Sequence, residues 1–411
     1  MFDHTHYVPI LRWKMGEKGA LRELRPKDRA KLTPLIEWSR PNEVAAHGES
    51  LATAETPQDL ARDIIKHWGA RPFFCDVHTL LDGHLGGQLD ALRRVAMGLR
   101  DGGTRPIPVL WLDDGPAYVS TLECLSSGAG ACLRLREDDV SRSGLQSRIE
   151  GLLSSIGVTT QHVDLVVDLA ADVTGMDVGV ICPALPRLGS WRTFTVVAGS
   201  FPPDLKAFQG PGRYYQPRAE WLVWKAQSSR RLPRLPTFGD YATLHPVLTT
   251  YKPGLNPSAS IRYATDESWM IMRGEGLRNE DGPGHAQYPA NAALLMRRPE
   301  YCGPSFSYGD KYISEVGAGR TGTGNPTTWV RAGVNHHLTF AVRQIASLFG
   351  AADARRSWRV AARGQGKRRR AHTAPALASA IPSPERRAPP GVPGPRSARA
   401  TSPAPQDRRA D

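Results

Sequence analysis

Asp164-Leu-Val-Val-Asp-Leu169 is the stretch that decides the fold class, together with Ile107-Pro-Val-Leu-Trp-Leu112. Both runs are short and largely apolar on both faces of an extended chain. Strands of this kind are typical of parallel sheets, because helices cover both faces of such a sheet. The two runs therefore predict buried parallel strands within an α/β fold.

Eight such runs alternate with segments that have helical spacing of apolar residues. The predicted strands are residues 7–13, 32–38, 73–77, 107–112, 131–135, 163–169, 192–198 and about 236–241. The predicted helices are residues 17–25, 56–68, 88–100, 116–125, 144–156, a stretch after 173, and 219–227. Eight βα repeats in about 235 residues match the size of a (β/α)8 barrel. The alternative is an open doubly wound sheet, but the first strand lacks the glycine-rich phosphate turn of such sheets.

An addition follows the eighth strand. Residues 260–264 and 269–273 predict a hairpin, because the turn-forming residues 265–267 lie between two strand-like runs. Residues 291–298 predict a helix, residues 317–326 a loop long enough to be a lid or part of a site, and residues 338–349 a closing helix. We expect one barrel-like domain over residues 6–350, with the hairpin inserted at about 260–274.

The positive charge of the chain is concentrated at its C-terminal end. The formal net charge is +13, and residues 351–411 hold 14 of the 53 Lys and Arg but only 4 of the 40 Asp and Glu. This tail is rich in Ala, Pro and Arg and has few large apolar residues, so we expect it to be disordered. It is either a dispensable extension or a basic arm that makes weak contacts with nucleic acid.

The remaining composition narrows the class of protein. Cysteine occurs five times, an odd number, with no paired CxxC spacing, which argues against a disulfide framework or a structural zinc site. The chain shows no apolar run approaching the roughly 18 residues of a membrane span and no signal-peptide pattern at its start. We expect a soluble, cytoplasmic protein.

Four blocks of the sequence together resemble a known family. They are YVPILRWKMGEKGAL at residues 7–21, LTPLIEW at 32–38, YGDKYI at 308–313, and GNPTTWVRAGVNHHLTF at 324–340. The chain resembles the beta protein family, named for protein beta of T-even phages, over roughly residues 6–348. The resemblance implies a single α/β domain and a role in phage–host conflict, but it implies no biochemical activity. Family members end soon after the last helix, so the tail departs from the pattern.

Polar residues at the C-terminal ends of barrel strands face the active mouth of such barrels. By this rule the candidates for catalysis are Lys14, Glu37, Asp76, Asp113 and Asp168. Converging carboxylates with one lysine suit general acid–base chemistry or a divalent metal held through oxygen. A carboxylate that ends a strand is equally common as a helix cap.

Lys14 and Glu37 lie in apolar surroundings, so each needs a partner of opposite charge. Because the first and second strands are neighbours, we expect Lys14 and Glu37 to pair across the barrel interior. The pair is either a buried salt bridge that stabilises the barrel or an acid–base pair.

The C-terminal blocks supply a second set of candidates. His336 is predicted to be catalytic, since histidine titrates near neutral pH, and adjacent histidines are a poor bidentate metal site. The predicted ligand-binding residues are Arg273, Asp310, Asn325, Trp329, Asn335 and His337. Arg262 and Arg273 lie on the predicted hairpin, where an arginine can hold a phosphate or carboxylate with two hydrogen bonds. The glycines and hydroxyls of residues 322–328 can form a nest for a phosphate.

Three functions remain open from the sequence. The first is an enzyme that acts at the barrel mouth, with hydrolysis or transfer at a phosphate ester as the reaction best suited to carboxylate, Lys, Arg and His groups. The second is a module that binds a small-molecule, nucleotide or protein ligand without catalysis. The third, a nucleic-acid binder that uses the tail, is the weakest because residues 1–350 are nearly neutral. The sequence does not specify a cofactor.

Overall fold

A computed structural model describes residues 2–38, 57–78, 93, 96–116, 118–120, 129–174, 177–247, 254 and 256–369; for residues 351–369 only the backbone is described. The chain divides into two compact units, residues 1–354 and 355–411. The predicted helices at residues 88–100 and 116–125 fall largely outside the described residues. The barrel, the added sheet and all candidate site residues belong to the first unit.

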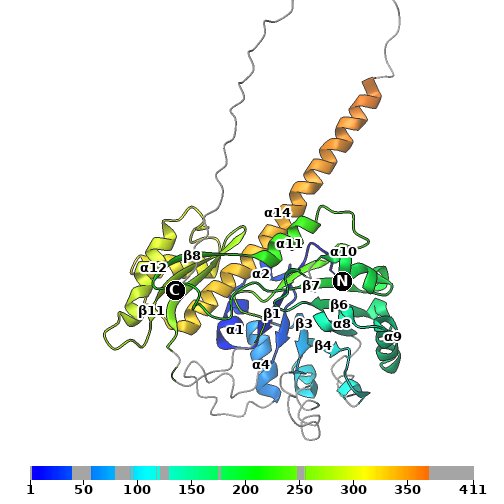
Figure 1. Cartoon of the computed structure of the whole chain (residues 1–411), viewed down its shortest axis with the longest axis horizontal. Coiled ribbons are helices and arrows are strands. Elements are labelled where there is room, and N and C mark those ends of the chain that lie inside the picture. Colours follow the sequence, from blue (N-terminus) through cyan, green and yellow to red (C-terminus); the bar gives the residue numbers. More distant parts are fainter. Residues whose placement is uncertain are drawn as a thin grey trace, which may run out of the picture. The chain divides into compact units, whose positions relative to one another are not determined.

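The first unit contains a closed barrel of eight parallel strands in the order β1-β2-β3-β4-β5-β6-β7-β9 (Figure 1). The strands are β1 (Tyr7–Arg12), β2 (Leu35–Glu37), β3 (Pro72–Asp76), β4 (Arg105–Trp111), β5 (Ala131–Arg136), β6 (Val163–Asp168), β7 (Thr193–Val197) and β9 (Thr237–Asp240). Each predicted strand is found, and β1 pairs with β9 to close the sheet. The (β/α)8 prediction is confirmed, and the open doubly wound sheet is wrong.

Helices cover the outside of the barrel. They are α1 (Met15–Arg22), α2 (Pro26–Arg29), α4 (Pro57–His67), α8 (Glu137–Ser141), α9 (Leu145–Ser155), α10 (Val178–Ala184) and α11 (Ala219–Gln227), with short 3-10 turns η2 (Thr160–His162) and η4 (Leu188–Ser190). None of the helices that the structure describes is long and apolar enough to cross a membrane.

Alternation along the strands divides the apolar residues between two cores. One set points into the barrel and forms a cluster from strand residues alone: Val8, Ile10, Leu35, Phe74, Ile107, Val109, Cys132, Val166 and Val197, with Tyr241 after β9. The other set packs against the surrounding helices. At the N-terminal end of the barrel, Arg192 donates to both oxygens of Asp164 at 3.0 and 2.6 Å. The interior is therefore filled by side chains, and its charged residues lie at its two ends.

A separate antiparallel sheet follows the order β10-β11-β8. Its strands are β8 (Gly212–Pro217), β10 (Ser258–Ala264) and β11 (Ser268–Gly276). The predicted hairpin is confirmed as β10 and β11. The third strand was not predicted, because β8 is a largely exposed edge strand without a buried face. The chain leaves the barrel after β7 to add β8 to this sheet and returns through α11 to β9.

The C-terminal segment is more helical than predicted. The helices are α12 (Gln287–Met296), preceded by the turn η5 (Gly284–Ala286), then α13 (Tyr308–Gly317) and α14 (Pro326–Arg369). The closing helix therefore begins twelve residues before the predicted start at residue 338. It also continues into the segment for which we predicted disorder; residues 370–411 lie outside the described residues.

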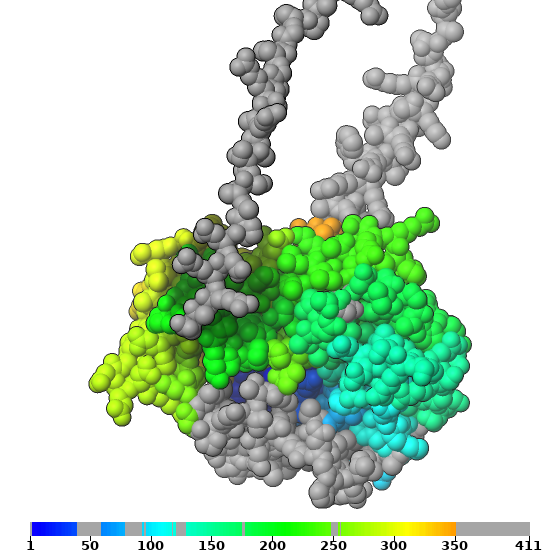
Figure 2. Space-filling view, in the orientation of Figure 1, coloured from blue at the N-terminus to red at the C-terminus, as the bar shows by residue number. Residues whose placement is uncertain are grey.

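The added sheet and α12 form one side of the first unit, and the helices of the middle of the chain form another. In the space-filling view they appear in yellow-green and yellow and in cyan and green, and a small blue area of the N-terminal segment is visible between them (Figure 2). In the cartoon, α14 runs between the sheet and the barrel (Figure 1). In the N-terminal segment it is α1 that lies next to α14, since the Ala20 carbonyl accepts a hydrogen bond from Asn335.

We predict that Gly239→Ala destabilises the barrel by about 1–3 kcal/mol. Gly239 lies in register with both Val8 and Val197, and an added Cβ would lie 2.8 Å from the Val8 carbonyl oxygen and 2.5 Å from Val197 Cγ2. Urea unfolding measures the change. The control is Gly151→Ala in the exposed middle of α9, where a Cβ meets nothing within 4 Å, so that the helix gains about 0.5–1 kcal/mol. Equal effects of the two substitutions would contradict the packing of β9.

Candidate functional site: a charged layer at the barrel mouth

A layer of charged side chains closes the C-terminal end of the barrel interior. In the strand register Arg12 lies beside Glu37, and Glu37 lies beside Asp76. Arg134 and Asp168 enter the same layer from β5 and β6. These side chains occupy the last inward positions of their strands, so strand alternation alone brings them together.

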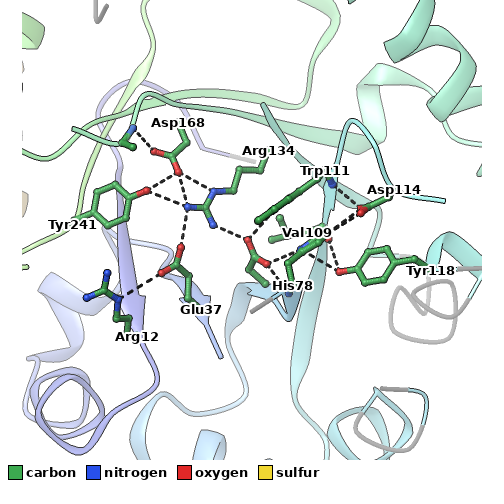
Figure 3. Close-up of polar contacts among 12 residues, drawn as sticks. Arg12, Glu37, His78, Val109, Trp111, Asp114, Tyr118, Arg134, Asp168 and Tyr241 are labelled. Atoms are coloured by element: carbon green, nitrogen blue, oxygen red, sulfur yellow. Dashed lines mark hydrogen bonds and ion pairs between the residues drawn. The ribbon is translucent and has the colours of Figure 1, made fainter. Parts of the chain in front are cut away.

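Arg134 is the centre of this layer (Figure 3). Its Nη1 donates to Asp76 Oδ2 at 2.6 Å, and its Nη2 donates to Glu37 Oε1 at 2.9 Å. Its Nε and Nη2 donate to Asp168 Oδ2 at 2.9 and 2.5 Å. Tyr241 completes the group, because its hydroxyl donates to the same Asp168 oxygen at 2.6 Å. One guanidinium is therefore shared by three carboxylates from three strands.

The predicted convergence of Glu37, Asp76 and Asp168 is thus observed, but around an arginine. A guanidinium has five N–H donors in one plane, so it can serve several carboxylates at once. Within the described residues, no three His, Cys, Asp or Glu side chains are placed to hold a metal ion. The carboxylates that we expected to suit a divalent metal are instead neutralised in part by Arg134.

A second arm extends the layer toward β4. His78 follows β3; its Nδ1 lies 2.7 Å from Asp76 Oδ1, and its Nε2 lies 2.9 Å from Asp114 Oδ1. The imidazole also stacks on the Trp111 ring, with centroids 4.1 Å apart and the planes 9° from parallel. Trp111 donates its backbone N–H to Asp114 at 2.7 Å. Both ring nitrogens of His78 thus face carboxylates, an arrangement that favours the charged imidazolium.

The titratable groups of the layer differ strongly in pKa. Burial raises the pKa of Glu37, because the charge of Arg134 does not fully offset the lost hydration and the repulsion from Asp76. Burial alone would also raise the pKa of Asp76, but His78 and then Arg134 hold it well below its ordinary value. Burial would lower the pKa of His78, yet the charge of Asp76 and the hydrogen bonds to Asp114 and Asp76 raise it to about 9. The surroundings therefore move the pKa values of Glu37 and Asp76 in opposite directions.

Two residues expected at the mouth need correction. Glu37 has cationic partners, but they are Arg134 and, at 3.9 Å, Arg12, in place of the expected Lys14. Lys14 lies at the N-cap of α1, and its charge acts on Glu17. Asp113 points away from the mouth and pairs with Arg142 and other arginines at the surface. Its neighbour Asp114 is the residue that joins the layer.

His336 does not face the mouth. It is fully buried on α14, with Nδ1 2.9 Å from Asp310 Oδ2 and Nε2 2.9 Å from the Ala264 carbonyl oxygen. Asp310 also accepts hydrogen bonds from Ser307 at 2.6 Å and from Tyr263 at 2.7 Å. These contacts join α13, α14 and β10. The cluster is internal, so the predicted catalytic role of His336 and ligand-binding role of Asp310 lack access to a ligand.

His337 and Asn335 are also buried. His337 Nε2 lies 2.7 Å from Asp240 Oδ2, on the outer face of β9, and burial lowers the pKa of this histidine. Asn335 donates to the Ala20 carbonyl at 2.9 Å and accepts from the Gly309 N–H at 3.1 Å. Both residues join α14 to its neighbours, and a ligand-binding role for them stays a prediction.

The last three predicted ligand residues lie apart from the mouth and from each other. Asn325 accepts the Thr328 N–H at 3.0 Å and begins α14 as its cap. Trp329 is buried and stacks on Tyr288 at 4.6 Å. Arg273 is half-buried and donates to the Gly210 carbonyl at 2.9 Å. Each of them thus makes a local structural contact, and the contacts of the described residues do not bring the three together.

The residues that the sequence reasoning missed are Arg12, His78, Asp114, Arg134 and Tyr241. Arg134 carried a usable signal, because it stands at an inward position of an otherwise apolar run. A charge on a buried strand needs a partner, and this holds for Arg134 as it does for Glu37. His78 and Asp114 follow their strands by two or three residues and carried no comparable signal.

Comparison with known proteins gives one match. Residues 7–343 match the profile of the family described as Beta protein. Searches of the curated proteins and of the solved structures find no match.

We predict that Arg134→Leu lowers the free energy of unfolding by about 3–5 kcal/mol, because it leaves three buried carboxylates without their shared cation. The matched control is Arg142→Leu, which removes an exposed ion pair with Asp113 and should change the free energy of unfolding much less. Chemical denaturation at neutral pH measures both. A loss for Arg134→Leu no larger than that of the control would show that the layer does not depend on this guanidinium.

We predict a pH dependence that belongs to His78. Its folded pKa of about 9 lies above the ordinary value of 6.5, so its contribution to stability is complete below pH 6.5 and is lost as the pH rises through 9. The wild type should lose on the order of 3 kcal/mol relative to His78→Gln over this range. Unfolding curves of both proteins between pH 6 and about 10 measure it. Parallel pH profiles would contradict the charged state of His78.

Proposed function

The chain belongs to the beta protein family, and from this premise we propose that it acts through the charged layer at its barrel mouth, where Glu37 transfers a proton during hydrolysis or transfer at a phosphate ester. The observation that carries the proposal is the separation of pKa values among Glu37, Asp76 and His78 within one layer. Groups whose pKa values are driven apart by their surroundings are typical of acid–base sites.

Glu37 is the most exposed of the three carboxylates that Arg134 joins, and this favours it as the proton-transfer group. Its side chain is 11% exposed, compared with 2% for Asp76 and 5% for Asp168. Its Oε1 accepts from Arg134, whereas its Oε2 has, among the described residues, only the distant contact with Arg12 at 3.9 Å. Of the three carboxylates that Arg134 joins, Glu37 is therefore the one that a ligand entering the mouth would meet first. Asp76 and Asp168 hold Arg134, which in turn orients Glu37.

In the proposed reaction Glu37 in its neutral form donates a proton to the leaving oxygen, or in its charged form accepts one from the attacking water or alcohol. Arg12 lies beside Glu37 and supplies positive charge for the phosphate oxygens. A raised pKa suits both roles, because it brings the titration of the Glu37 carboxyl closer to neutral pH than that of an ordinary glutamate.

The alternative is a site that binds its ligand without catalysis. This alternative is favoured by the hydrogen bonds that the side chains of the layer already make with one another. At least two side-chain hydrogen bonds hold each of Arg134, Asp76 and Asp168. In this case the layer holds a rigid surface, and Glu37 contributes a hydrogen bond in place of a proton transfer.

We propose a biological role in phage–host conflict, inside the cytoplasm. The support is the resemblance of the four sequence blocks to the family named for protein beta of T-even phages. Plaque counts on cells with wild type or Glu37→Gln test this role: protection or interference that requires Glu37 supports it, and equal counts with and without the wild-type gene contradict it.

We predict that Glu37→Gln retains the fold and lowers turnover of a phosphate ester by roughly 10²–10⁴-fold, the contribution of a positioned acid or base. The measurement is a phosphate-release screen over nucleotides and sugar phosphates, followed by kinetics on the best substrate. The control is Glu150→Gln, an exposed glutamate paired with Arg187 far from the mouth. Equal turnover by both variants contradicts the catalytic role. Thermal stabilisation by a ligand without turnover supports the binding alternative.

A further inference from the structure

The strand β8 forms an edge of the added sheet, and its outer side pairs with no other strand among the described residues. The sheet has the order β10-β11-β8, so β11 covers only one side of β8. Every residue of β8 is exposed or half-buried, and Tyr215 is 42% exposed. The other edge is different, because the Ala264 carbonyl of β10 accepts a hydrogen bond from His336 of α14. Within the described residues the open edge of this sheet is therefore β8.

The register of the sheet determines which backbone groups of β8 point outward. In an antiparallel pair of strands, residue pairs that exchange hydrogen bonds alternate with pairs that do not. The Arg218 N–H donates to the Glu267 carbonyl at 2.9 Å, and these two residues continue the register between β8 and β11. Counting back by two along the chain, the even-numbered residues of β8 bond to β11. Arg213 and Tyr215 therefore direct their N–H and C=O groups away from β11.

The outward groups of Arg213 and Tyr215 form a short row of two donors and two acceptors. None of the four has a hydrogen-bond partner in the part of the chain that the structure describes. The next outward carbonyl, that of Pro217, is already used, because it accepts from the Ser200 hydroxyl at 3.1 Å. Pro211 and Pro217 flank the row and have no N–H, so the row ends at both prolines. A row of this kind is a template for one further strand.

We propose that β8 pairs with β8 of a second copy of this chain, antiparallel and about a two-fold axis. In the register that we infer, Arg213 of one copy faces Tyr215 of the other, and each such pair exchanges two hydrogen bonds. The two symmetric pairs use every outward group of both copies. A shift by two residues in either direction sets Tyr215 against Pro211 or Arg213 against Pro217, which lack an N–H. The prolines therefore leave one register in which all the groups are bonded.

The side chains of β8 fit the same register. Arg213 is exposed, and its guanidinium lies 5.8 Å from the centre of the Tyr215 ring of its own chain. The Tyr215 hydroxyl donates to Glu300 Oε1 at 2.8 Å, and Glu300 also pairs with Arg298 at 3.5 Å. In the dimer Arg213 faces Tyr215 of the other copy, beside this carboxylate, whereas the two Arg213 side chains do not face each other. Opposite charges and cation–ring contacts across two strands favour their pairing.

Pairing through β8 gives a closed and weak dimer. Two three-stranded sheets join into one sheet, and its outer edges are then the two β10 strands, which α14 contacts through Ala264. A two-fold contact of this kind uses the same surface on both copies, so assembly stops at two. The contact involves one strand of 6 residues, and small interfaces are weak, so we expect a Kd on the order of 10–100 µM. The inference is independent of the reaction proposed for the mouth.

Sedimentation equilibrium of the full chain between about 5 and 500 µM tests the dimer. We predict a monomer–dimer equilibrium for the wild type and association weaker by roughly tenfold or more for Arg213→Pro. This substitution removes an outward N–H from each copy but none of the bonds to β11. The matched control is Arg213→Ala, which removes the same side chain, keeps the N–H and should weaken association less. A wild type that stays monomeric over this range, or equal association of the two variants, overturns the proposal.

Hydrogen exchange of the wild type gives a second readout, which decides the question if Arg213→Pro fails to fold. In concentrated protein the amides of Arg213 and Tyr215 should exchange more slowly than in dilute protein. The amides of Tyr214 and Gln216 are the internal control, because they bond to β11 and should be equally slow at both concentrations. Protection of Arg213 and Tyr215 that does not depend on concentration means that another part of the chain covers this edge, which overturns the proposal. Fast exchange of both at every concentration overturns it as well.

Discussion

The guanidinium of Arg134 is the interaction on which the interior of this barrel depends. It lies at the C-terminal end of the barrel, where the layer of inward side chains changes from apolar to charged. Glu37, Asp76 and Asp168 have lost most of their hydration there, and three such charges repel one another unless a cation lies between them. Arg134 meets this requirement with four hydrogen bonds to the three carboxylates. The same bonds hold β2, β3, β5 and β6 at a common level.

The C-terminal addition is attached by a different device, three consecutive residues of α14. Asn335 bonds to α1 and α13, His336 to α13 and β10, and His337 to β9. Successive helical residues point in directions about 100° apart, so a single turn can reach three neighbours. The polar cluster that suggested catalysis in the sequence is therefore a joint between the barrel and the added sheet. Asn335 and His336 have satisfied hydrogen bonds, as this structural role requires, whereas His337 Nδ1 has no hydrogen-bond partner among the described residues.

Because α14 fixes the added sheet against the barrel, Arg262 of β10 lies next to the end of β1. From the barrel axis outward, five charged residues then follow one another in space with alternating sign: Arg134, Glu37, Arg12, Glu17 and Arg262. The inner members are held by direct ion pairs, whereas Glu17 and Arg262 interact over a longer distance.

Local patterns were sufficient for the elements of the barrel. Eight apolar runs, separated by segments with helical spacing, predicted its strands. A strand that is buried on both faces is apolar at most positions, so six residues are enough to identify it. The strand β8 lacks such an apolar run because it is mostly exposed, and the early start of α14 lacks one because it lies among polar and glycine residues.

The rule that polar residues at strand ends face the mouth identified Glu37, Asp76 and Asp168 from their positions alone. Their partner depended on closure of the barrel, because Arg134 is 97, 58 and 34 residues from these three carboxylates. Strand alternation in the sequence predicts which side chains point into the barrel. Which of these side chains contact one another depends on the register of the closed barrel, and this register places Arg134 at the centre of the layer. The packing of α14 likewise depends on the tertiary structure, and it places His336 among buried structural contacts.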